Sequence, residues 1–249
     1  MSQLKRLLPF ILSGMFLCAA HAESQRTLFT VENQFPNWEQ FEAGGSFTFR
    51  DGDEDSFAPD TTVSSIYLRY GLLSNLAVQL DVPIVNLDFP RGGDETGLGD
   101  MELSFQLLTY EDIFGYPYFI PHVSVTLPTG DEDKGLGNDD PVITAGIAYG
   151  STINDWIDWV IDLSYRINSD QDNQIIVGHS YAWNMSDSFA IITELLYEEA
   201  LDSDEDSQVL VSAGFSYDWT EKLQLDVSAG GGLTGPVDAY GNVSVRYSF

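Results

Sequence analysis

The last nine residues of the chain decide the fold. They read Gly241-Asn242-Val243-Ser244-Val245-Arg246-Tyr247-Ser248-Phe249. Apolar and polar residues alternate from Val243 onward, and the chain closes on an aromatic side chain. Strands of an outer-membrane β-barrel show this alternation because they face lipid and lumen in turn. The segment therefore predicts the last strand of such a barrel, and we expect the barrel assembly machinery to be a partner that recognises the strand ending in Phe249.

Residues 1–22 have the pattern of a secretory signal peptide. Lys5 and Arg6 form a short positive region, an apolar stretch follows from residue 7 to 20, and Ala20-His21-Ala22 has the form of a cleavage site. The apolar stretch is too short to span a bilayer as a helix. We therefore expect cleavage near Ala22, a mature chain that begins at Glu23, and the outer membrane of a Gram-negative bacterium as the location.

The charge of the chain restricts its partners. Its formal net charge is −29, with 10 basic and 39 acidic residues. Removal of Lys5 and Arg6 with the signal leaves eight basic residues against 39 acidic ones, a formal charge of −31. Nucleic acid is excluded as a partner because its phosphates would be repelled. The hydrophobic content of 43% in regular alternation argues against a disordered acidic chain.

The remaining sequence predicts an all-β protein. Period-two alternation recurs over residues 41–249 and predicts a transmembrane antiparallel up-and-down β-barrel of about twelve strands. The predicted strands are 41–49, 66–70, 76–82, 101–107, 119–127, 143–149, 161–166, 175–182, 189–195, 209–216, 223–228 and 243–249. Residues 23–40 have no such pattern, and the sequence leaves two alternatives for them: a periplasmic lead-in or a plug element.

The connections predict which end of the barrel faces outward. Polar, mostly acidic segments follow the odd strands, at 51–55, 91–95, 130–133, 168–172, 202–206 and 233–236, whereas mostly tighter turns follow the even strands. Barrels of this kind have long outer loops and short periplasmic turns, so both barrel termini should lie in the periplasm. Trp156, Trp159, Trp183 and Trp219 stand beside the short turns and predict an aromatic girdle at the periplasmic interface.

The acidic loops suggest a role for divalent cations. Asp51, Asp53 and Asp55 imitate the start of a calcium-binding EF-hand loop, but Ser56 replaces the required glycine and Thr62 stands where the bidentate glutamate belongs. We therefore expect neither a dedicated metal site nor a cofactor. Two alternatives remain for the loops: Mg²⁺ or Ca²⁺ could bridge them to phosphates of lipopolysaccharide, a partner together with outer-membrane lipid, or they are simply solvated.

Charged side chains are predicted on the lumen face of the strands. The candidates for lining the lumen and setting its selectivity are Arg69, Asp81, Glu102, His122, Asp162, Arg166, Glu194, Asp226 and Arg246. Such ions can pair across the lumen and seal it, line a wet path with weak cation selectivity, or only stabilise the barrel interior. Twelve strands give a diameter between a filled eight-stranded barrel and an open porin, so they do not decide among these roles.

An outer-membrane lipid hydrolase is a further alternative, because such an enzyme also needs only about twelve strands. It would use a His-x-Ser pair on one strand face, with a third group to orient the imidazole. His179 and Ser180 are adjacent and should face opposite sides of the sheet. His122 and Ser124 have the right spacing, but they should face the lumen and lack an evident third group. The sequence therefore predicts no catalytic residues.

Two glycine-rich motifs carry a family resemblance. Gly97-Leu98-Gly99-Asp100 opens one predicted strand, and Leu127-Pro128-Thr129-Gly130 closes the next, followed by Gly135-Leu136-Gly137. In this order and spacing the chain resembles the family of outer-membrane proteins named for the MetA pathway of phenol degradation. The resemblance implies a channel or transporter barrel for passive passage of small solutes, aromatic or other hydrophobic compounds among them. A sealed structural or interaction barrel with acidic surface loops is the alternative.

Overall fold

The structure, a computed structural model, describes residues 29–31, 35–52, 58–90, 93–111, 117–153, 156–169, 172–201 and 207–249. The predicted signal peptide, residues 1–22, lies outside the described residues. The same holds for much of the acidic loops, namely residues 53–57, 91–92, 170–171 and 202–206.

The described chain consists of β-strands and a short 3₁₀ helix, η2 (Glu132–Lys134). The strands are β1 (Phe41–Gly52), β2 (Asp60–Leu73), β3 (Leu76–Asp88), β4 (Asp94–Leu98), β5 (Met101–Leu107), β6 (Tyr110–Glu111), β7 (Tyr118–Leu127), β8 (Val142–Ile153), β9 (Ile157–Ile167), β10 (Gln174–Ser186), β11 (Phe189–Ala200), β12 (Gln208–Thr220), β13 (Leu223–Thr234) and β14 (Val237–Ser248). No described helix has the length and apolar composition needed to cross a membrane.

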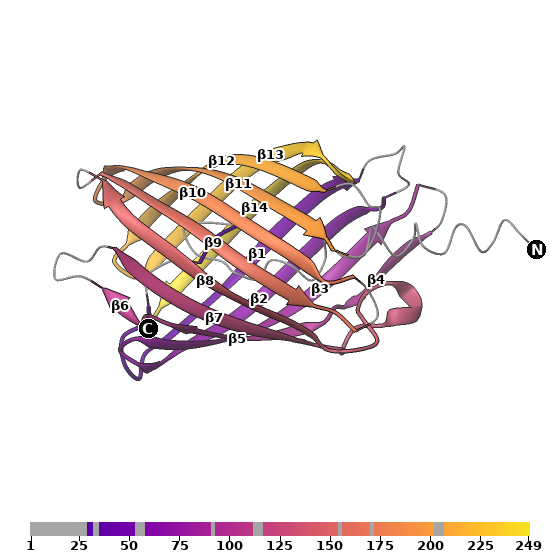
Figure 1. Cartoon of the computed structure of the whole chain (residues 1–249), viewed down its shortest axis with the longest axis horizontal. Helices are drawn as coiled ribbons and strands as arrows, with labels where there is room; N and C mark the ends of the chain where they lie inside the picture. Colours follow the sequence, from indigo (N-terminus) through magenta and orange to yellow (C-terminus); the bar gives the residue numbers. More distant parts are fainter. Residues whose placement is uncertain are drawn as a thin grey trace, which may run out of the picture.

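The strands form one closed antiparallel barrel (Figure 1). Neighbours in the chain pair with each other, and the sheet closes because β1 pairs with both β2 and β14. Strands β4, β5 and β6 share one place in the wall, since β4 and β5 both pair with β3 and β5 and β6 both pair with β7, so the barrel has 12 strands. The predicted fold class and strand number are confirmed. The amide of Phe249 donates to the carbonyl of Phe41 (3.0 Å), which places the two ends of the barrel sequence side by side.

The predicted facing of the strand residues is also confirmed. On β2, Ile66 and Leu68 are 67% and 47% exposed, whereas Tyr67 and Arg69 between them are 5% and 1% exposed. The same alternation runs through the other barrel strands, with apolar side chains outside and mainly polar or small ones inside, together with some large apolar ones such as Ile120 and Leu196. An apolar outer face and a polar interior are what a barrel in lipid requires.

Two predicted loops differ from the structure. Asp94 and Glu95 were expected in an outer loop but begin strand β4, which is followed by a break in the wall. The break lies opposite Pro83 of β3, whose carbonyl accepts from the amide of Gly99 (2.9 Å). Proline has no N–H to donate beside that carbonyl, so the ladder lacks one hydrogen bond where the break occurs.

The second difference is the connection between β13 and β14. Residues 233–236 were predicted as a long outer loop, but β13 runs to Thr234 and β14 begins at Val237. Gly235 and Pro236 alone make the turn, and Gly235 has a φ of 91°. Glycine adopts this left-handed conformation without the steric cost that other residues meet, which allows so tight a connection.

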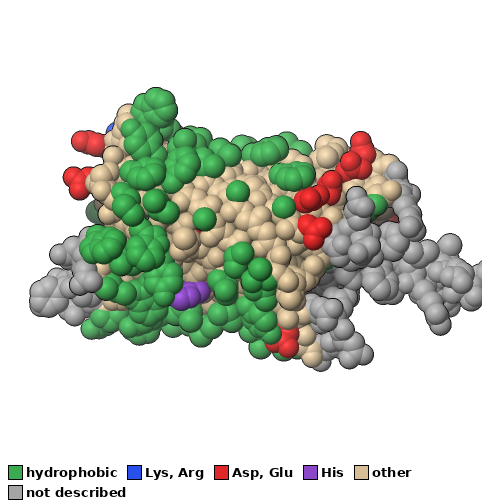
Figure 2. Space-filling view, turned by 90° about the horizontal axis from the view of Figure 1, so that it is seen from above, with side chains coloured by type: hydrophobic (Ala, Val, Ile, Leu, Met, Phe, Trp, Pro, Cys, Tyr) green, Lys and Arg blue, Asp and Glu red, His purple; other side chains and the backbone are tan. Residues whose placement is uncertain are grey.

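Hydrophobic side chains are spread over the outer face and gather most densely towards one end (Figure 2). Trp156 and Trp183 lie in contact near the turn between β8 and β9, with ring centroids 6.0 Å apart. Tyr149 packs edge-on against Trp159 (5.3 Å), and Tyr217 likewise against Trp219 (6.3 Å). All four predicted girdle tryptophans therefore lie at the end of the barrel that carries the C terminus, in the arrangement expected of an interfacial belt.

Candidate functional site

The interior of the barrel is lined by charged side chains. All nine predicted lumen residues lie on the inner face, together with charged residues that were not among the candidates, including Glu42, Arg50 and Glu198. Glu42 stood on the predicted inner face of the first strand, while Arg50 and Glu198 follow where the predicted strands stop. Extending the alternation by a few residues would have found both. The inner carboxylates include Glu42, Asp81, Glu102, Asp158, Asp162, Glu194, Glu198 and Asp226, and the buried arginines are Arg50, Arg69, Arg166 and Arg246.

The arginines pair along the wall. Arg69 Nη1 lies 3.5 Å from Glu42 Oε2 on the next strand, and Arg69 Nη2 donates to Gln106 Oε1 (2.8 Å). The guanidinium also lies over the ring of Phe35, 5.3 Å from its centroid. Each contact offsets part of the cost of removing the guanidinium charge from water, which explains how Arg69 can be only 1% exposed.

The other two predicted arginines follow the same rule. Arg166 Nη1 donates to Gln174 Oε1 (2.8 Å) and lies 3.9 Å from Glu198 Oε1. Arg246 donates to the side-chain oxygen of Gln224 on β13. These partners stand one or two strands away on the wall, so the contacts run around the barrel. These contacts join nearby strands and do not cross the lumen, whereas pairing across it was one of the alternatives raised by the sequence.

Residues 29–31 lie inside the barrel against three neighbouring strands. The amide of Phe29 donates to Glu194 Oε1 on β11 (3.0 Å), and the amide of Val31 donates to Asp162 Oδ2 on β9 (3.3 Å). Between them, the hydroxyl of Thr30 bonds to that of Ser180 on β10 (2.8 Å). Side chains predicted to line the lumen therefore hold part of the segment that precedes the barrel.

Apolar side chains of residues 29–31 occupy two clusters of the inner wall. Phe29 packs with Leu196, Leu210, Val237 and Tyr240. Val31 packs with Tyr118, Ile120, Ala148 and Val160, with Phe35 at the edge of the cluster. The inner wall thus combines oriented polar acceptors with apolar surfaces beside them.

One glycine allows this close approach. A Cβ atom on Gly178 would lie 2.1 Å from the carbonyl oxygen of Phe29, which is closer than any side chain can stand. Gly178 lies on β10, two residues before Ser180, and its missing side chain leaves room for the backbone of residue 29.

The two described histidines of the barrel lie on opposite faces of the wall, His122 inside and His179 outside. His122 Nε2 lies 3.1 Å from Asp162 Oδ1, and the same oxygen accepts from the hydroxyl of Ser164 (2.8 Å). Asp162 is a third group that the sequence did not reveal, but it lies in the lumen with His122. His179 packs between aromatic rings on the outer face, 4.8 Å from Tyr181, whereas Ser180 is buried inside, as predicted.

The glycine-rich motifs meet at the carboxylate of Asp100. Its Oδ1 accepts from the amides of Thr129 (3.0 Å) and Gly130 (2.8 Å). Its Oδ2 accepts from the amide (2.7 Å) and the side chain (2.9 Å) of Asn138. We call this arrangement of Asp100 with the loop of residues 128–141 the latch. It ties the loop between β7 and β8 to the break between β4 and β5.

Other residues of the two motifs complete the latch. Thr129 Oγ1 donates to the carbonyl of Gly99 (3.1 Å) and accepts from the amide of Met101 (2.9 Å). Leu136 is buried with Val85 and Leu87 of β3. Gly135 ends η2 with a φ of 76°, the left-handed conformation that lets Leu136 turn back to the wall. Pro128 follows Leu127, the last residue of β7, where pairing has ended. The structure therefore gives the motifs a structural explanation.

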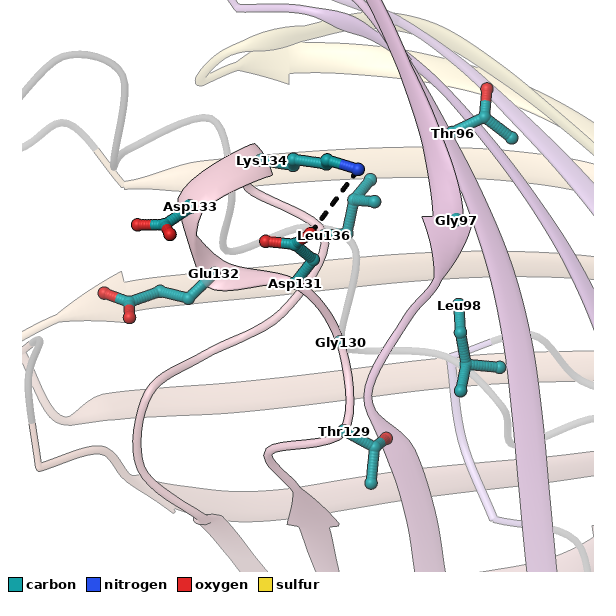
Figure 3. Close-up of a pocket in the computed structure, with 10 residues that line it drawn as sticks. All are labelled: Thr96, Gly97, Leu98, Thr129, Gly130, Asp131, Glu132, Asp133, Lys134 and Leu136. Atoms are coloured by element: carbon teal, nitrogen blue, oxygen red, sulfur yellow. Dashed lines mark ion pairs between the residues drawn. The ribbon is translucent and has the colours of Figure 1, made fainter.

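A pocket of about 520 Å³ lies beside the latch (Figure 3). Thr96, Gly97 and Leu98 of β4 form one side, and the loop of residues 129–136 with η2 forms the other. Lys134 pairs with Asp131 across the turn of the loop (3.5 Å). The β4 segment pairs with β3 alone, so its second edge faces this pocket.

A second pocket, of about 410 Å³, lies at the end of the barrel that carries the C terminus. Glu42, Gln224 and Arg246 line it from inside the barrel, together with residues of the turns at 187–188 and 218–222. Charged lumen side chains therefore reach a cavity at this end.

Three carboxylates stand side by side beyond the apolar outer face. Asp88 pairs in register with Asp60 on β2 and with Asp94 on β4. The pKa of Asp88 is raised, first by the charge of Asp94 and then by smaller effects of dehydration and Asp60. No group of three or more His, Cys, Asp or Glu side chains suited to a metal ion occurs in the described ranges. The divalent bridge to lipopolysaccharide stays a prediction.

A closed twelve-stranded barrel with an apolar exterior and a charged interior defines the class: an outer-membrane type of β-barrel. The chain belongs to the family described as "Putative MetA-pathway of phenol degradation", whose model matches residues 37–242. No curated protein matches the sequence.

Several solved structures with the same fold are described as outer-membrane channels or porins. The crystal structure of the COG4313 outer membrane channel from Pseudomonas putida F1 is similar with a TM-score of 0.73 and 15% identity, over 90% of this chain and 100% of that one. The NanC porin has a TM-score of 0.62 and 7% identity, over 83% and 100% of the two chains. The KdgM porin has a TM-score of 0.60 and 10% identity, over 84% and 99%. At these identities the similarity establishes the fold.

Proposed function

We propose that the protein is an outer-membrane channel that passes small solutes, including amphipathic or hydrophobic ones, by diffusion through the lumen. The observation that carries this proposal is the pairing of the buried arginines along the wall. Ion pairs that run around a barrel leave its axis to a solute, whereas pairs across it would close the axis. The pocket lined by Glu42 and Arg246 supports an exit at the end that carries the C terminus.

Residues 29–31 act as a plug element in this proposal, the second of the two alternatives that the sequence left for residues 23–40. Their three polar contacts and two apolar clusters support that role. A solute that enters must displace these residues or pass beside them. No catalytic role is proposed, because His122 and Ser124 lie inside the barrel, away from lipid, and the similar structures named above are channels and porins.

A sealed barrel is the second candidate, and the same contacts of residues 29–31 favour it. Single-channel recording from refolded mature protein in a planar bilayer separates the two. A channel should show discrete openings whose cation preference rises in Arg69→Gln and Arg166→Gln, because each change removes a positive charge from the lumen.

Lys134→Gln is the charge-matched control, since Lys134 is the half-exposed last residue of η2, outside the lumen wall, and its substitution should leave selectivity unchanged. Folding of each variant is checked by heat-modifiable mobility on a gel. Absence of openings from folded wild-type protein would contradict the channel and support the sealed barrel.

A further inference from the structure

Two carboxylates of the inner wall present one oxygen each to residues 29–31. Glu194 offers Oε1 to the amide of Phe29 (3.0 Å), and Asp162 offers Oδ2 to the amide of Val31 (3.3 Å). Both side chains are about nineteen-twentieths buried, at 6% and 5% exposure. The donors in both cases belong to a segment outside the barrel wall, so these oxygens serve as acceptors for something that lies within the lumen.

The wall itself holds the other oxygen of each carboxylate. Glu194 Oε2 accepts from the hydroxyl of Ser212 on β12 (3.1 Å). Asp162 Oδ1 accepts from Ser164 (2.8 Å) and lies 3.1 Å from His122 Nε2. Each carboxylate is therefore oriented by rigid strands, and its inward oxygen keeps its direction when the occupant changes. Such pre-organisation lowers the cost of binding a donor.

Apolar surface lies beside both acceptors. Leu196 and Leu210 flank the strand positions around Glu194, and Val160 and Ala148 do the same around Asp162. The segment fills this arrangement with N–H donors and with the side chains of Phe29 and Val31. A ligand that fits the same arrangement carries an N–H donor at one end and an apolar group at the other.

Charge selects among such ligands. The inner carboxylates outnumber the four buried arginines, and the whole chain carries −29. A carboxylate ligand would be repelled, whereas an ammonium group would be attracted. The amides of Phe29 and Val31 are neutral donors, whereas an ammonium group adds the attraction of opposite charges to the hydrogen bond with a carboxylate. An ammonium group can therefore compete with residues 29–31 for the two oxygens.

We propose that Glu194 and Asp162 form a binding site in the lumen for the protonated amine of a small amphipathic compound, which replaces the amides of Phe29 and Val31. This site deepens the proposed channel function, and rests on it, by naming the class of solute. The segment acts as a stand-in for that solute: its N–H donors occupy the carboxylates, and its apolar side chains occupy the neighbouring wall.

Binding of hexylamine tests the proposal, with hexanoate and hexanol as ligands of equal chain length. The protein is full-length mature chain in nanodiscs, measured by calorimetry against empty nanodiscs at pH 7, where the amine is protonated. Hexylamine should bind about tenfold more tightly than either comparison ligand, since one charge-assisted bond contributes about that factor. Equal affinity for hexanoate or hexanol would overturn the proposal.

Three variants sharpen the test. Glu194→Gln and Asp162→Asn should each weaken hexylamine binding about tenfold. Asp226→Asn is the matched control: it is a buried lumen carboxylate that bonds to Gln224 and Ser244 of the wall. Its hexylamine affinity should stay within about twofold of wild type. An equal loss in Asp226→Asn and Glu194→Gln would show general electrostatic attraction and overturn the specific site.

A proline substitution tests the stand-in role without touching the carboxylates. Val31→Pro removes the amide that Asp162 accepts, so the segment competes less and hexylamine should bind more tightly, by about threefold or more. Unchanged affinity in this variant would count against competition for Asp162. Conductance of the same preparations separates the two proposals: openings without amine preference leave the channel standing and reject this site, whereas silence rejects the channel.

Discussion

The wall from β8 to β14 and the wall from β3 to β7 are made of similar strands but are held together differently. From β8 to β14 each strand pairs with the next over nearly its full length, and register shifts occur near strand ends. Between β3 and β7 the ladder is broken at Gly99 and Asp100, and four N–H groups converge on one carboxylate instead. The first region depends on many equivalent backbone bonds, whereas at the break in the second region a single side chain takes their place. A single substitution should therefore do far more damage in the second region.

The largest expected effect comes from Asp100→Ala. The change removes the acceptor of four hydrogen bonds, and bonds to a charged group contribute about 1.5–3 kcal/mol each, part of which water restores once the loop opens. We expect the free energy of local opening to fall by about 3 kcal/mol, which corresponds to exchange roughly a hundredfold faster at the amides of Thr129, Gly130 and Asn138. Hydrogen exchange measures these rates.

The control for this prediction lies in the regular wall. Asp226→Ala also removes a buried carboxylate, but its partners are the side chains of Gln224 and Ser244, which can turn to other acceptors. Exchange within β12–β14 should change by less than tenfold, an effect of under about 1.4 kcal/mol. If both variants loosen their regions equally, the latch is not a special point in the wall.

The next effect is steric and comes from Gly137→Ala. A Cβ atom at this position would lie 2.3 Å from Asp100 Oδ1, so the latch must shift to admit it. Overpacking of this kind costs about 1–3 kcal/mol. Thermal melting in detergent and amide exchange at Asn138 should both register the loss. Gly93→Ala should leave both unchanged, because no atom lies within 4 Å of a Cβ placed there.

The comparison also explains how much could be predicted from the sequence. Alternation of apolar and polar residues is a local signal, so it predicted the strands and the facing of every candidate lumen residue from Arg69 to Arg246. It also predicted that His179 and Ser180 face opposite sides. Alternation does not show where a strand ends. The predicted strands stopped at residues 49 and 195 and therefore missed Arg50 and Glu198, which lie on longer strands.

The latch and the contacts of residues 29–31 could not be predicted in this way. Asp100 meets Asn138 through a loop, and Glu194 meets Phe29 across 165 positions of sequence, so no periodic pattern relates them. Pro83 was an available signal for the break, because a proline in a central strand argues against continuous pairing. Glycine-rich motifs marked where the backbone comes close to other atoms, but not which carboxylate they meet.

A smaller effect is expected where the regular wall meets residues 29–31. Gly178→Ala places a Cβ atom 2.1 Å from the carbonyl oxygen of Phe29, whereas the ladder of β10 itself tolerates alanine. Alanine should therefore weaken the contact of the segment by about 1 kcal/mol or more and leave the barrel folded. If the segment is a plug, single-channel conductance should rise. Gly241→Ala, whose Cβ would meet its nearest atom at 3.9 Å, should leave conductance unchanged, and a rise in both variants would contradict the role of the segment.

The smallest effect should come from the ion pair on the loop that the latch holds. Lys134 lies 3.5 Å from Asp131, and both side chains are about half exposed, at 49% and 48%. Water and salt screen such a pair, so it contributes about 0.5 kcal/mol or less. Lys134→Gln should leave amide exchange at Thr129, Gly130 and Asn138 within about threefold of wild type. Loosening comparable to that of Asp100→Ala would mean that surface charge, rather than the buried carboxylate, holds the loop against the broken wall.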